Sequence, residues 1–394
     1  MAVTITQSPQ AITPSDNPVT WVFSSNQYAQ ANFSFIIEVY VNTVLVGRYL
    51  RFPEVNSDTC HFDLNEENIG RIRCAKPTID ATTLVQDAGN TTSVYIKVIE
   101  RYGSPASDHA SATSSTVKLF KASLSDSDFA DFDYTDYAFN TNKAWLTNFP
   151  STETYYCGIS ENAYLMALTN SVVGIDVKVM LYDSAGSLIV TDYFSSGSAA
   201  DCKIVNVSPT KIIAATSITS GNFANCEYYK VYLTDYVFTT SGFTIYIDRS
   251  CDNYDTKRLH FLSSLGAMES FSFTMANNTS RQITHNGYEK QWGGYNASNA
   301  YVYSNSQGRE VDFLTTSTGS MVVRTDFMEQ GIQNWLVREL YESPYVLLST
   351  GIASDLKRVK VLNSGYELKD IRQGQLISEE VTINTSDVRR SALI

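Results

Sequence analysis

The chain of 394 residues is too long for one ordinary hydrophobic core, so we expect about two to four domains. Its formal net charge of −12 argues against nonspecific binding to nucleic acid or to anionic membranes and leaves a basic partner open. Hydrophobic residues make up 43% and aromatic residues 12%, with 25 Tyr and only 9 Pro, a profile typical of β-sheet proteins.

The amino-terminal residues and the cysteines bear on where the chain is made. Residues 1–7 lack a basic region and an apolar core, so we expect no secretory signal, and no run of about 18 apolar residues predicts a membrane span. The cysteines are dispersed and form no C-x-x-C pair, which argues against zinc. We therefore expect the cysteines to be buried free thiols and the protein to be made in a reducing cytoplasm. We also expect that the protein binds no cofactor. The cysteines are Cys60, Cys74, Cys157, Cys202, Cys226 and Cys251.

Residues 1–104 are predicted to form a first β-rich block. Short extended runs at Val3–Ile5 and Val19–Phe23 precede an alternating run, and residues 42–44 then turn into the strand 45–52 of a hairpin. The alternating apolar residues, expected on one face, are Phe33, Phe35, Ile37, Val39 and Val41. About six short strands in about a hundred residues predict a small β-sandwich of immunoglobulin-like size, without the Cys-Trp-Cys signature.

Small polar residues dominate the stretch 105–116, which is predicted to be a linker because such residues bury too little surface to hold an ordered fold. A second β-sandwich is expected over 117–250. Alternation at 177–182 marks one of its strands. A type I turn is expected at 183–186, where Asp and Gly occupy the first and fourth positions.

The third block, 251–394, combines strands with the clearest helical pattern. Strands are expected at residues 269–275, 300–303, 311–314, 321–324, 345–348, 359–362 and 377–383. A helix is predicted over about 326–342, with Asp326 as its cap and Glu329 completing a capping box. Its apolar stripe consists of Phe327, Ile332, Trp335, Leu336 and Leu340. We expect a β-sheet or β-barrel domain carrying one α-helix, and overall a mainly β, multi-domain fold.

An acidic run interleaved with aromatic residues is the densest charge feature. The acids are Asp126, Asp128, Asp131, Asp133 and Asp136. Clustered carboxylates could bind calcium, but the spacing lacks the central Gly and terminal Glu of an EF-hand. We favour the interpretation that this stretch is an exposed loop that binds a partner, with Phe132 and Tyr134 as candidate contacts.

The pattern of reactive residues argues against an enzyme. The four histidines are His61, His109, His260 and His285, and none has metal-ligand spacing. No G-x-S-x-G, P-loop or G-x-G-x-x-G is present, although a triad assembled in space leaves no such trace. His260 lies among core-like residues and is expected to be structural. We predict no catalytic, metal or cofactor residues.

A second candidate contact is the aromatic, Gly-loosened stretch GYEKQWGGYNASNAY, which contains Tyr288, Trp292 and Tyr295. Flat aromatic rings beside amide groups suit sugar binding, in which rings stack on C–H faces while amides bond hydroxyls. The alternatives are a structural loop whose rings pack on the third block, and a protein contact, where Tyr and Trp are enriched.

Three stretches carry a resemblance to a known family. Cys251–Met275 contains Cys-x-x-Tyr, Arg-Leu-x-Phe-Leu, Leu-Gly and Phe-x-Phe; the opening has Ile5-Thr-Gln-x-Pro9; the late segment has Trp335-Leu336 and Ser343-Pro344. Together they resemble virion tail proteins of crAss-like and related Bacteroidetes-infecting tailed bacteriophages. None of these matches is a catalytic motif.

The resemblance implies a structural virion component of the tail hub, baseplate or tail-tip type, assembled in the host bacterial cytoplasm. Its expected partners are other tail proteins and further copies of itself in a homo-oligomeric ring, with no nucleic acid or membrane partner. The alternative is a receptor- or carbohydrate-binding tail adhesin that recognises a host-surface glycan through the stretch near Trp292. A hub should assemble without binding sugar, whereas an adhesin should bind glycan and lose it on Trp292→Ala.

Overall fold

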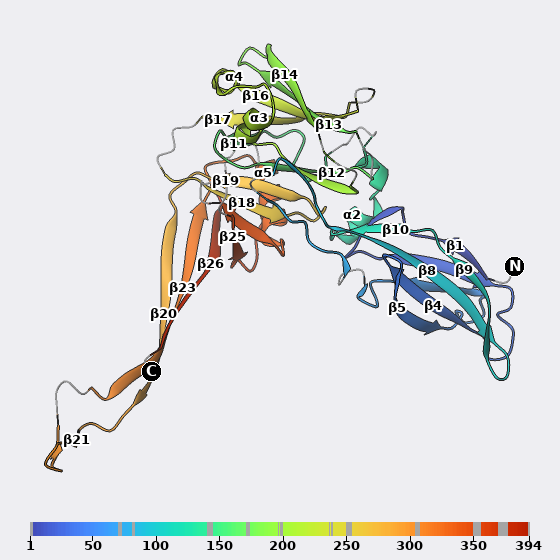
Figure 1. The fold of residues 1–394 in the computed structure, drawn as a ribbon, viewed down its shortest axis with the longest axis horizontal. Helices are drawn as coiled ribbons and strands as arrows, with labels where there is room; N and C mark the ends of the chain where they lie inside the picture. The colour runs from blue at the N-terminus through green and yellow to red at the C-terminus, as the bar shows by residue number, and fades with distance from the viewer. Residues whose placement is uncertain are drawn as a thin grey trace. The chain divides into compact units, whose positions relative to one another are not determined.

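The computed structural model describes residues 3–69, 73–80, 83–139, 145–170, 174–195, 197, 200–235, 237, 239–249, 254–303, 308–349, 356–368 and 377–392. Contacts divide the chain into two compact units. Unit 1 consists chiefly of residues 1–250 and 260–270, and unit 2 of 251–259, 271–351 and 355–394. Strands outnumber helices throughout (Figure 1), so the predicted mainly β, multi-domain fold is confirmed.

The first sandwich of unit 1 extends from Val3 to Phe120, beyond the expected end at residue 104. Its strands are β1 (Val3–Gln7), β2 (Ile12–Pro14), β3 (Thr20–Ser25), β4 (Ser34–Val41), β5 (Val44–Arg51), β6 (Thr59–Asp63), β8 (Thr91–Tyr102), β9 (Ser107–Thr113) and β10 (Val117–Phe120). One sheet has the order β1-β3-β6, and the other β2-β10-β8-β4-β5 with β9 paired to β8. Trp21, Phe35 and Ile96 belong to the shared core.

Residues 33–41 confirm the predicted alternation, because Phe33 and every second residue after it belong to that core. The predicted hairpin is also present. Asn42 and Thr43 have φ of 47° and 68°, the left-handed values that a two-residue turn between twisted strands requires.

The linker prediction for residues 105–116 is wrong. Ser107–Thr113 forms β9, which pairs antiparallel with the Lys97–Tyr102 part of β8, and the His109 ring stacks on Tyr102 with centroids 3.8 Å apart. Composition misleads here because an exposed strand on an existing sheet is held by backbone hydrogen bonds and does not need apolar side chains.

The second sandwich of unit 1 contains β11 (Tyr155–Gly158), β12 (Tyr164–Leu168), β13 (Asp176–Tyr182), β14 (Leu188–Ser195), β15 (Cys202–Asn206), β16 (Tyr228–Thr234) and β17 (Phe243–Asp248). The sheet β11-β17-β16-β13-β14 shares a core with the sheet β12-β15-β7, in which β7 is Val85–Asp87. The turn predicted at 183–186 is present, with the Gly186 amide donating to the Asp183 carbonyl at 3.0 Å. Two short helices, α3 (Pro209–Ala215) and α4 (Ser220–Ala224), were not predicted.

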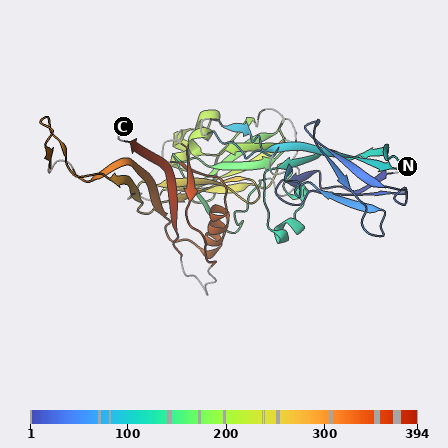
Figure 2. The ribbon, with the colours of Figure 1, turned by 90° about the horizontal axis from the view of Figure 1, so that it is seen from below.

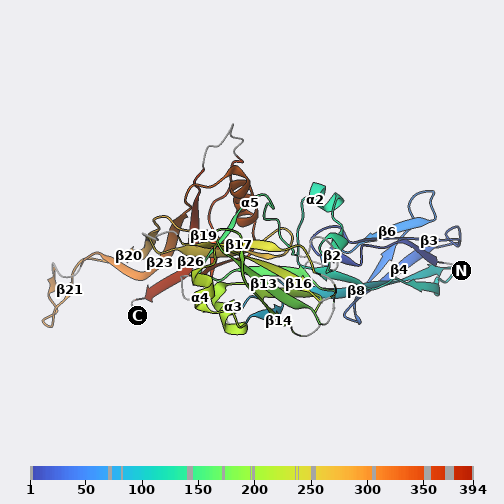
Figure 3. The ribbon, with the colours of Figure 1, turned by 90° about the horizontal axis from the view of Figure 1, so that it is seen from above.

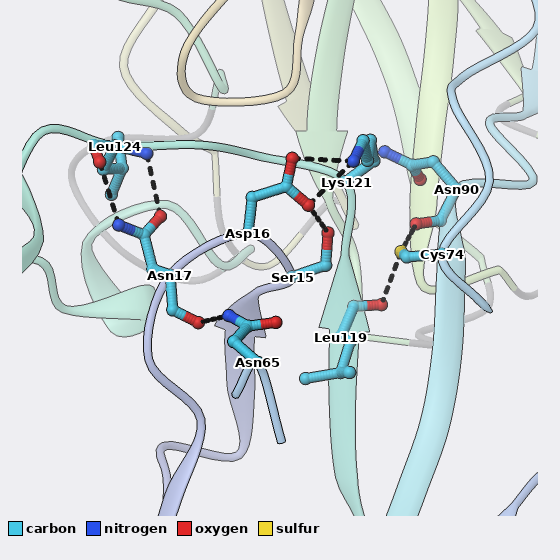
Figure 4. Close-up of polar contacts among 9 residues, drawn as sticks. All are labelled: Ser15, Asp16, Asn17, Asn65, Cys74, Asn90, Leu119, Lys121 and Leu124. Carbon is cyan, nitrogen blue, oxygen red and sulfur yellow. Dashed lines mark hydrogen bonds and ion pairs between the residues drawn. The ribbon is translucent and has the colours of Figure 1, made fainter. Parts of the chain in front are cut away.

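Polar contacts join the two halves of unit 1. The strand β7 lies in the first block but pairs with β15 of the second, and Lys118 forms an ion pair with Asp201. In Figure 4, Asp16 binds the Lys121 ammonium at 2.7 Å, while both ends of the Asn17 side-chain amide bond the Leu124 backbone at 2.8 and 2.9 Å. Residues on both sides of the expected boundary therefore belong to one compact unit.

The hairpin of β18 (Lys257–Leu262) and β19 (Met268–Phe273) corresponds to the stretch that carries the strongest resemblance. Its turn, within residues 260–270, belongs to unit 1, where Glu269 accepts hydrogen bonds from the Thr147 hydroxyl and the Asn148 amide, both at 2.8 Å. Gly266 has φ of +78°, and a Cβ there would overlap the Lys121 carbonyl oxygen. His260 is fully buried and bonds Ser270 at 2.7 Å.

Unit 2 is organised on a sheet with the order β19-β18-β24-β25-β26-β23-β20. Its further strands are β20 (Asn278–Glu289), β23 (Glu310–Arg324), β24 (Val346–Ser349), β25 (Leu356–Val361) and β26 (Glu380–Ala392), and a separate small hairpin joins β21 (Gly294–Tyr295) to β22 (Tyr301–Val302). Residues 311–314 and 321–324, predicted as two strands, belong to the single strand β23. The strand β20 was not predicted.

The predicted helix is present as α5 (Gln330–Tyr341), but it begins four residues later than expected and Asp326 does not cap it. Met328 instead forms a β-bridge with Ile377, with hydrogen bonds of 2.8 and 3.0 Å, which keeps the preceding residues extended. Phe327 is consequently exposed and lies outside the apolar stripe, whereas Trp335 is buried.

Candidate functional site

Three strands of unit 2, β20, β23 and β26, form what we call the arm. It extends from the rest of the sheet towards the small β21–β22 hairpin (Figures 1 and 2). The strand β20 pairs with β23 from Asn278 opposite Val322 to Glu289 opposite Glu310, and β23 pairs with β26 on its other side. All 12 residues of β20 are exposed.

The outer edge of β20 is the distinctive feature of the arm. The strand is the last in the sheet order, so among the described residues no strand pairs with its outer side. An edge strand presents a row of backbone N–H and C=O groups that can add a strand from another chain. Ile283, on this edge strand, is 57% exposed.

The amino-acid content of the arm explains why it forms strands without a core. Thr and Ser follow one another along β23, and Thr favours extended backbone because it is β-branched. Cross-strand side-chain contacts supplement the backbone ladder: Ser280 and Ser320 hydroxyls lie 2.8 Å apart, and His285 Nδ1 lies 2.9 Å from the Asp312 carboxylate. Polar side chains on an exposed ribbon keep it compatible with water.

The base of the arm, in the unit that also contains α5 (Figure 3), includes buried side chains. Val323 of β23 and Val381 and Ile383 of β26 are fully buried. The ring of Trp335 on α5 lies 6.2 Å from the ring of Phe271. The buried Gln333 amide donates to the Glu379 carboxylate at 2.9 Å. The base is therefore packed, while β20 is open.

An aromatic hairpin closes the far end of the arm. Asn296 organises its turn, since the side-chain oxygen accepts from the amides of Ser298 and Ala300 at 2.9 and 3.0 Å. The Tyr301 hydroxyl donates to the Trp292 carbonyl at 2.8 Å, and the Trp292 ring lies 4.8 Å from the Tyr303 ring.

Charged groups flank this hairpin. The Arg309 guanidinium lies 5.9 Å from the Trp292 ring centroid and 3.5 Å from the Glu289 carboxylate. Both ends of that ion pair are mostly exposed, so it contributes about 0–1 kcal/mol.

The predicted contact residues fall into two places. Tyr288, Trp292 and Tyr295 lie at the far part of the arm, with 55%, 38% and 76% of their surface exposed. Tyr295 and Tyr301 meet edge to face at 5.2 Å, although most of the Tyr295 side chain stays exposed.

Phe132 and Tyr134 lie instead in unit 1, in the acidic segment that runs from Asp126 to Asp136 and contains α2 (Asp126–Ala130) and the 3-10 helix η1 (Tyr134–Asp136). Phe132 is only 7% exposed and packs against Phe120 and Tyr137, so the expectation that it is an exposed contact is wrong. Tyr134 is half-buried.

The aspartates of the acidic segment are all exposed. Ser125 caps α2 by accepting from the Asp128 amide at 3.2 Å. Hydrogen bonds from the Thr135 amide and hydroxyl hold the pKa of Asp133 below its usual range. Asp133 therefore carries a charged carboxylate at neutral pH.

The described residues offer no group of three or more His, Cys, Asp or Glu side chains arranged to hold a metal ion. Nor does any helix in the described ranges combine the length and the apolar character needed to cross a membrane. The five described cysteines are buried, and none of them forms a disulfide with another described cysteine, whereas Cys251 lies outside the described residues. No known protein family and no curated protein matches the sequence.

Proposed function

We propose that the protein is a structural subunit of a tailed-phage virion, of the hub, baseplate or tail-tip type, and that copies of it join into a ring through the arm. The observation that supports this function best is the exposed, 12-residue edge strand β20. The phage context comes from the resemblance of the residues around Cys251–Met275 and of the late segment. The proposed location is the virion tail, assembled in the host cytoplasm with other tail proteins.

Strand addition along β20 accounts for the features of the arm. A neighbouring copy that contributes a strand would satisfy the outward backbone groups and cover one side of Ile283 and Tyr288. Each added backbone hydrogen bond contributes about 0.5–1.5 kcal/mol net, so a contact several residues long yields useful affinity without a large apolar surface. A head-to-tail contact repeated by rotation closes a ring, and the rotation sets the copy number.

The test is the mass of the purified full chain in solution by light scattering, at rising concentration in reducing buffer. We expect a closed multiple of the chain mass. Ile283→Lys places a charge on the edge strand and should shift the protein towards the monomer, because lysine on an edge disfavours strand addition.

Thr318→Lys is the matched control, because Thr318 lies on β23 of the same arm, where the strand pairs with β20 at Gln282 and with β26 at Val388. It adds the same charge without touching the edge, so it should leave the ring intact. A wild-type chain that stays monomeric at every concentration, or equal losses in both variants, would count against the arm as the ring contact.

A second function, a glycan-binding adhesin, is favoured by the exposure of Tyr295 and Tyr303 at the far end of the arm, 76% and 64%. Rings this open can stack on sugar C–H faces. A glycan array with the full chain and with Tyr295→Ala separates the two functions. Binding that disappears in the variant, from a protein that does not form rings, would replace the hub by the adhesin.

A further inference from the structure

The outward face of the sheet β11-β17-β16-β13-β14 in unit 1 is unusually rich in tyrosine. Val177, Val179 and Leu181 of β13 point into the core of the sandwich and are fully buried. The alternate residues and their cross-strand partners therefore face outward. We call its aromatic and basic part the tyrosine–lysine face; it consists of Tyr156, Tyr182, Tyr193, Tyr228, Tyr232, Tyr246, Lys178 and Lys230. Met180 lies between these residues, and Asp176 and Asp248 lie on the same side at the ends of β13 and β17.

The tyrosine rings on this face pack against one another across the strands. Tyr182 and Tyr228 are directly opposite in the register and stack with centroids 5.0 Å apart and planes 11° apart. Tyr246 lies 5.1 Å from Tyr228 and 5.9 Å from Tyr156. Neighbouring rings cover much of each ring face, so what the surface offers a partner is mainly ring edges and hydroxyl groups, which favours a hydrogen-bond acceptor over a stacked sugar.

The two lysines are held among the rings. The Lys230 ammonium lies 5.6 and 5.9 Å from the Tyr182 and Tyr228 centroids. The Lys178 ammonium lies 5.9 Å from both the Tyr193 and the Tyr232 ring. These distances are within the range of cation–π attraction, which favours positions of the two charges on the face.

Neither ammonium forms an ion pair with any described residue, although the chain has 41 acidic and only 29 basic residues. Burial raises the pKa of Tyr228 and of Tyr232, so these phenols remain protonated hydrogen-bond donors at neutral pH. The middle of the face, where two cations lie among phenol donors, is complementary to carboxylates, whereas Asp176 and Asp248 lie at strand ends.

We propose that the tyrosine–lysine face binds the acidic segment Asp126–Asp136 of a second copy of this chain. The segment offers exposed carboxylates, which match the charge of the two lysines. It also contains the half-buried Tyr134, an aromatic side chain of the same type as the tyrosines on the face. The contact joins two different surfaces of unit 1 and is therefore head-to-tail. It concerns a different unit from the arm and does not depend on strand addition along β20.

Two complementary charge reversals test the contact. The face variant carries Lys178→Glu and Lys230→Glu, and the segment variant carries Asp126→Lys and Asp131→Lys. Sedimentation of each full chain over a concentration series should show self-association weakened by about tenfold or more, because like charges then meet across the contact. A control carrying Lys97→Glu and Lys360→Glu changes the net charge equally on other surfaces and should associate as the wild type does.

Mixing the two variants is the decisive step, since a Glu face meets a Lys segment and a Lys face meets an Asp segment. We expect the mixture to regain association close to that of the wild type, which variants that are merely misfolded could not do. Normal association of the folded face variant alone, or failure of the mixture to recover, would overturn the proposal.

Two further arms of the experiment separate this contact from others. In an Ile283→Lys background the face reversals should still weaken the remaining association, and no further loss there would contradict the proposal. Polygalacturonate serves as a polyanionic glycan probe. If it binds the wild type but not the face variant while self-association is unchanged, the occupant is an acidic glycan and the second copy is excluded.

Discussion

The strands β8 in unit 1 and β20 in unit 2 have the same length, 12 residues, yet their side chains have opposite surroundings. In β8, Val94, Ile96 and Val98 are fully buried in the sandwich core. In β20 every residue is exposed, and the one aliphatic side chain of comparable size, Ile283, is 57% exposed. The comparison teaches that strand formation and core formation are separate properties of this chain.

The two strands also differ in what stabilises them. Each fully buried aliphatic side chain of β8 contributes about 1.5–3 kcal/mol by leaving water. The strand β20 relies on its ladder with β23, on surface side-chain pairs and on the packed base below α5. We therefore expect the sandwich to unfold as one cooperative body and the arm to open locally at lower cost.

The largest expected effect comes from the sandwich core. Phe35 is fully buried and meets both Phe23 and Phe33 edge to face at 4.9 Å. Phe35→Ala should destabilise unit 1 by about 3–5 kcal/mol in denaturant unfolding, because the cavity remains. Phe313→Ala on the arm, where Phe313 is 48% exposed, should change stability little. Similar losses in both variants would remove the distinction between the strands.

Hydrogen exchange compares the strands directly. We expect peptide amides of β20 to exchange faster than those of β8 by about two orders of magnitude or more, since local opening of the arm exposes no core. Mass spectrometry of peptic peptides from the Ile283→Lys protein, at a concentration low enough for sedimentation to show a monomer, measures this without interference from assembly. Equal protection would mean that the arm is part of the cooperative core.

The next effect is a loss of stability from a substitution in the turn between β18 and β19, which belongs to unit 1. Gly266→Ala should cost about 1–3 kcal/mol, because the backbone has a left-handed φ and the new Cβ meets the Lys121 carbonyl. Gly294→Ala, on the hairpin at the far end of the arm, is the control, since a Cβ there has no neighbour within 4 Å. Thermal unfolding should separate the two variants, and an unchanged transition for Gly266→Ala would show that the turn tolerates a side chain.

The smallest expected effect is a change in the stability of unit 2 at high pH, which reports on Tyr341 at the base of the arm. Burial, reinforced by Glu379 and Glu380, raises the pKa of Tyr341 to about 12. The unfolded chain ionises this tyrosine near pH 10, so its contribution is complete below that pH and falls as pH rises towards 12. Tyr341→Phe should flatten the alkaline decline of unit 2 stability, and an unchanged decline would assign it to other groups.

Sequence patterns predicted those elements whose apolar residues repeat with the period of a buried face. The alternation at Phe33 to Val41 located β4, and the stripe at Trp335, Leu336 and Leu340 located α5. The strands β9 and β20 were not predicted from the sequence. All of β20 is exposed, and β9 has no fully buried residue, so neither stretch shows a regular repeat of apolar residues. The start of α5 was misplaced because its limit is a β-bridge between Met328 and Ile377, a contact far along the chain.

The candidate site was predicted only in part, for the same reason. Tyr288, Trp292 and Tyr295 were singled out by residue type, and they do lie exposed on the arm. Phe132 was misjudged because the adjacent aspartates suggested exposure while its ring packs on Phe120. The tyrosine–lysine face was missed, since its members come from five strands and only the register of the sheet brings them together. The available signal was the alternation of buried residues with Lys178 and Tyr182 in β13 and with Tyr228, Lys230 and Tyr232 in β16.

The buried thiols make the protein a reporter of its own unfolding. Burial raises the pKa of Cys60 and of Cys226 to about 11 and that of Cys74 to about 12, so each is almost entirely an unreactive thiol in the folded chain. Cys60 lies in the first sandwich and Cys226 in the second. The order in which a thiol-alkylating reagent marks them as denaturant rises would therefore record which sandwich opens first, with no probe added to the chain.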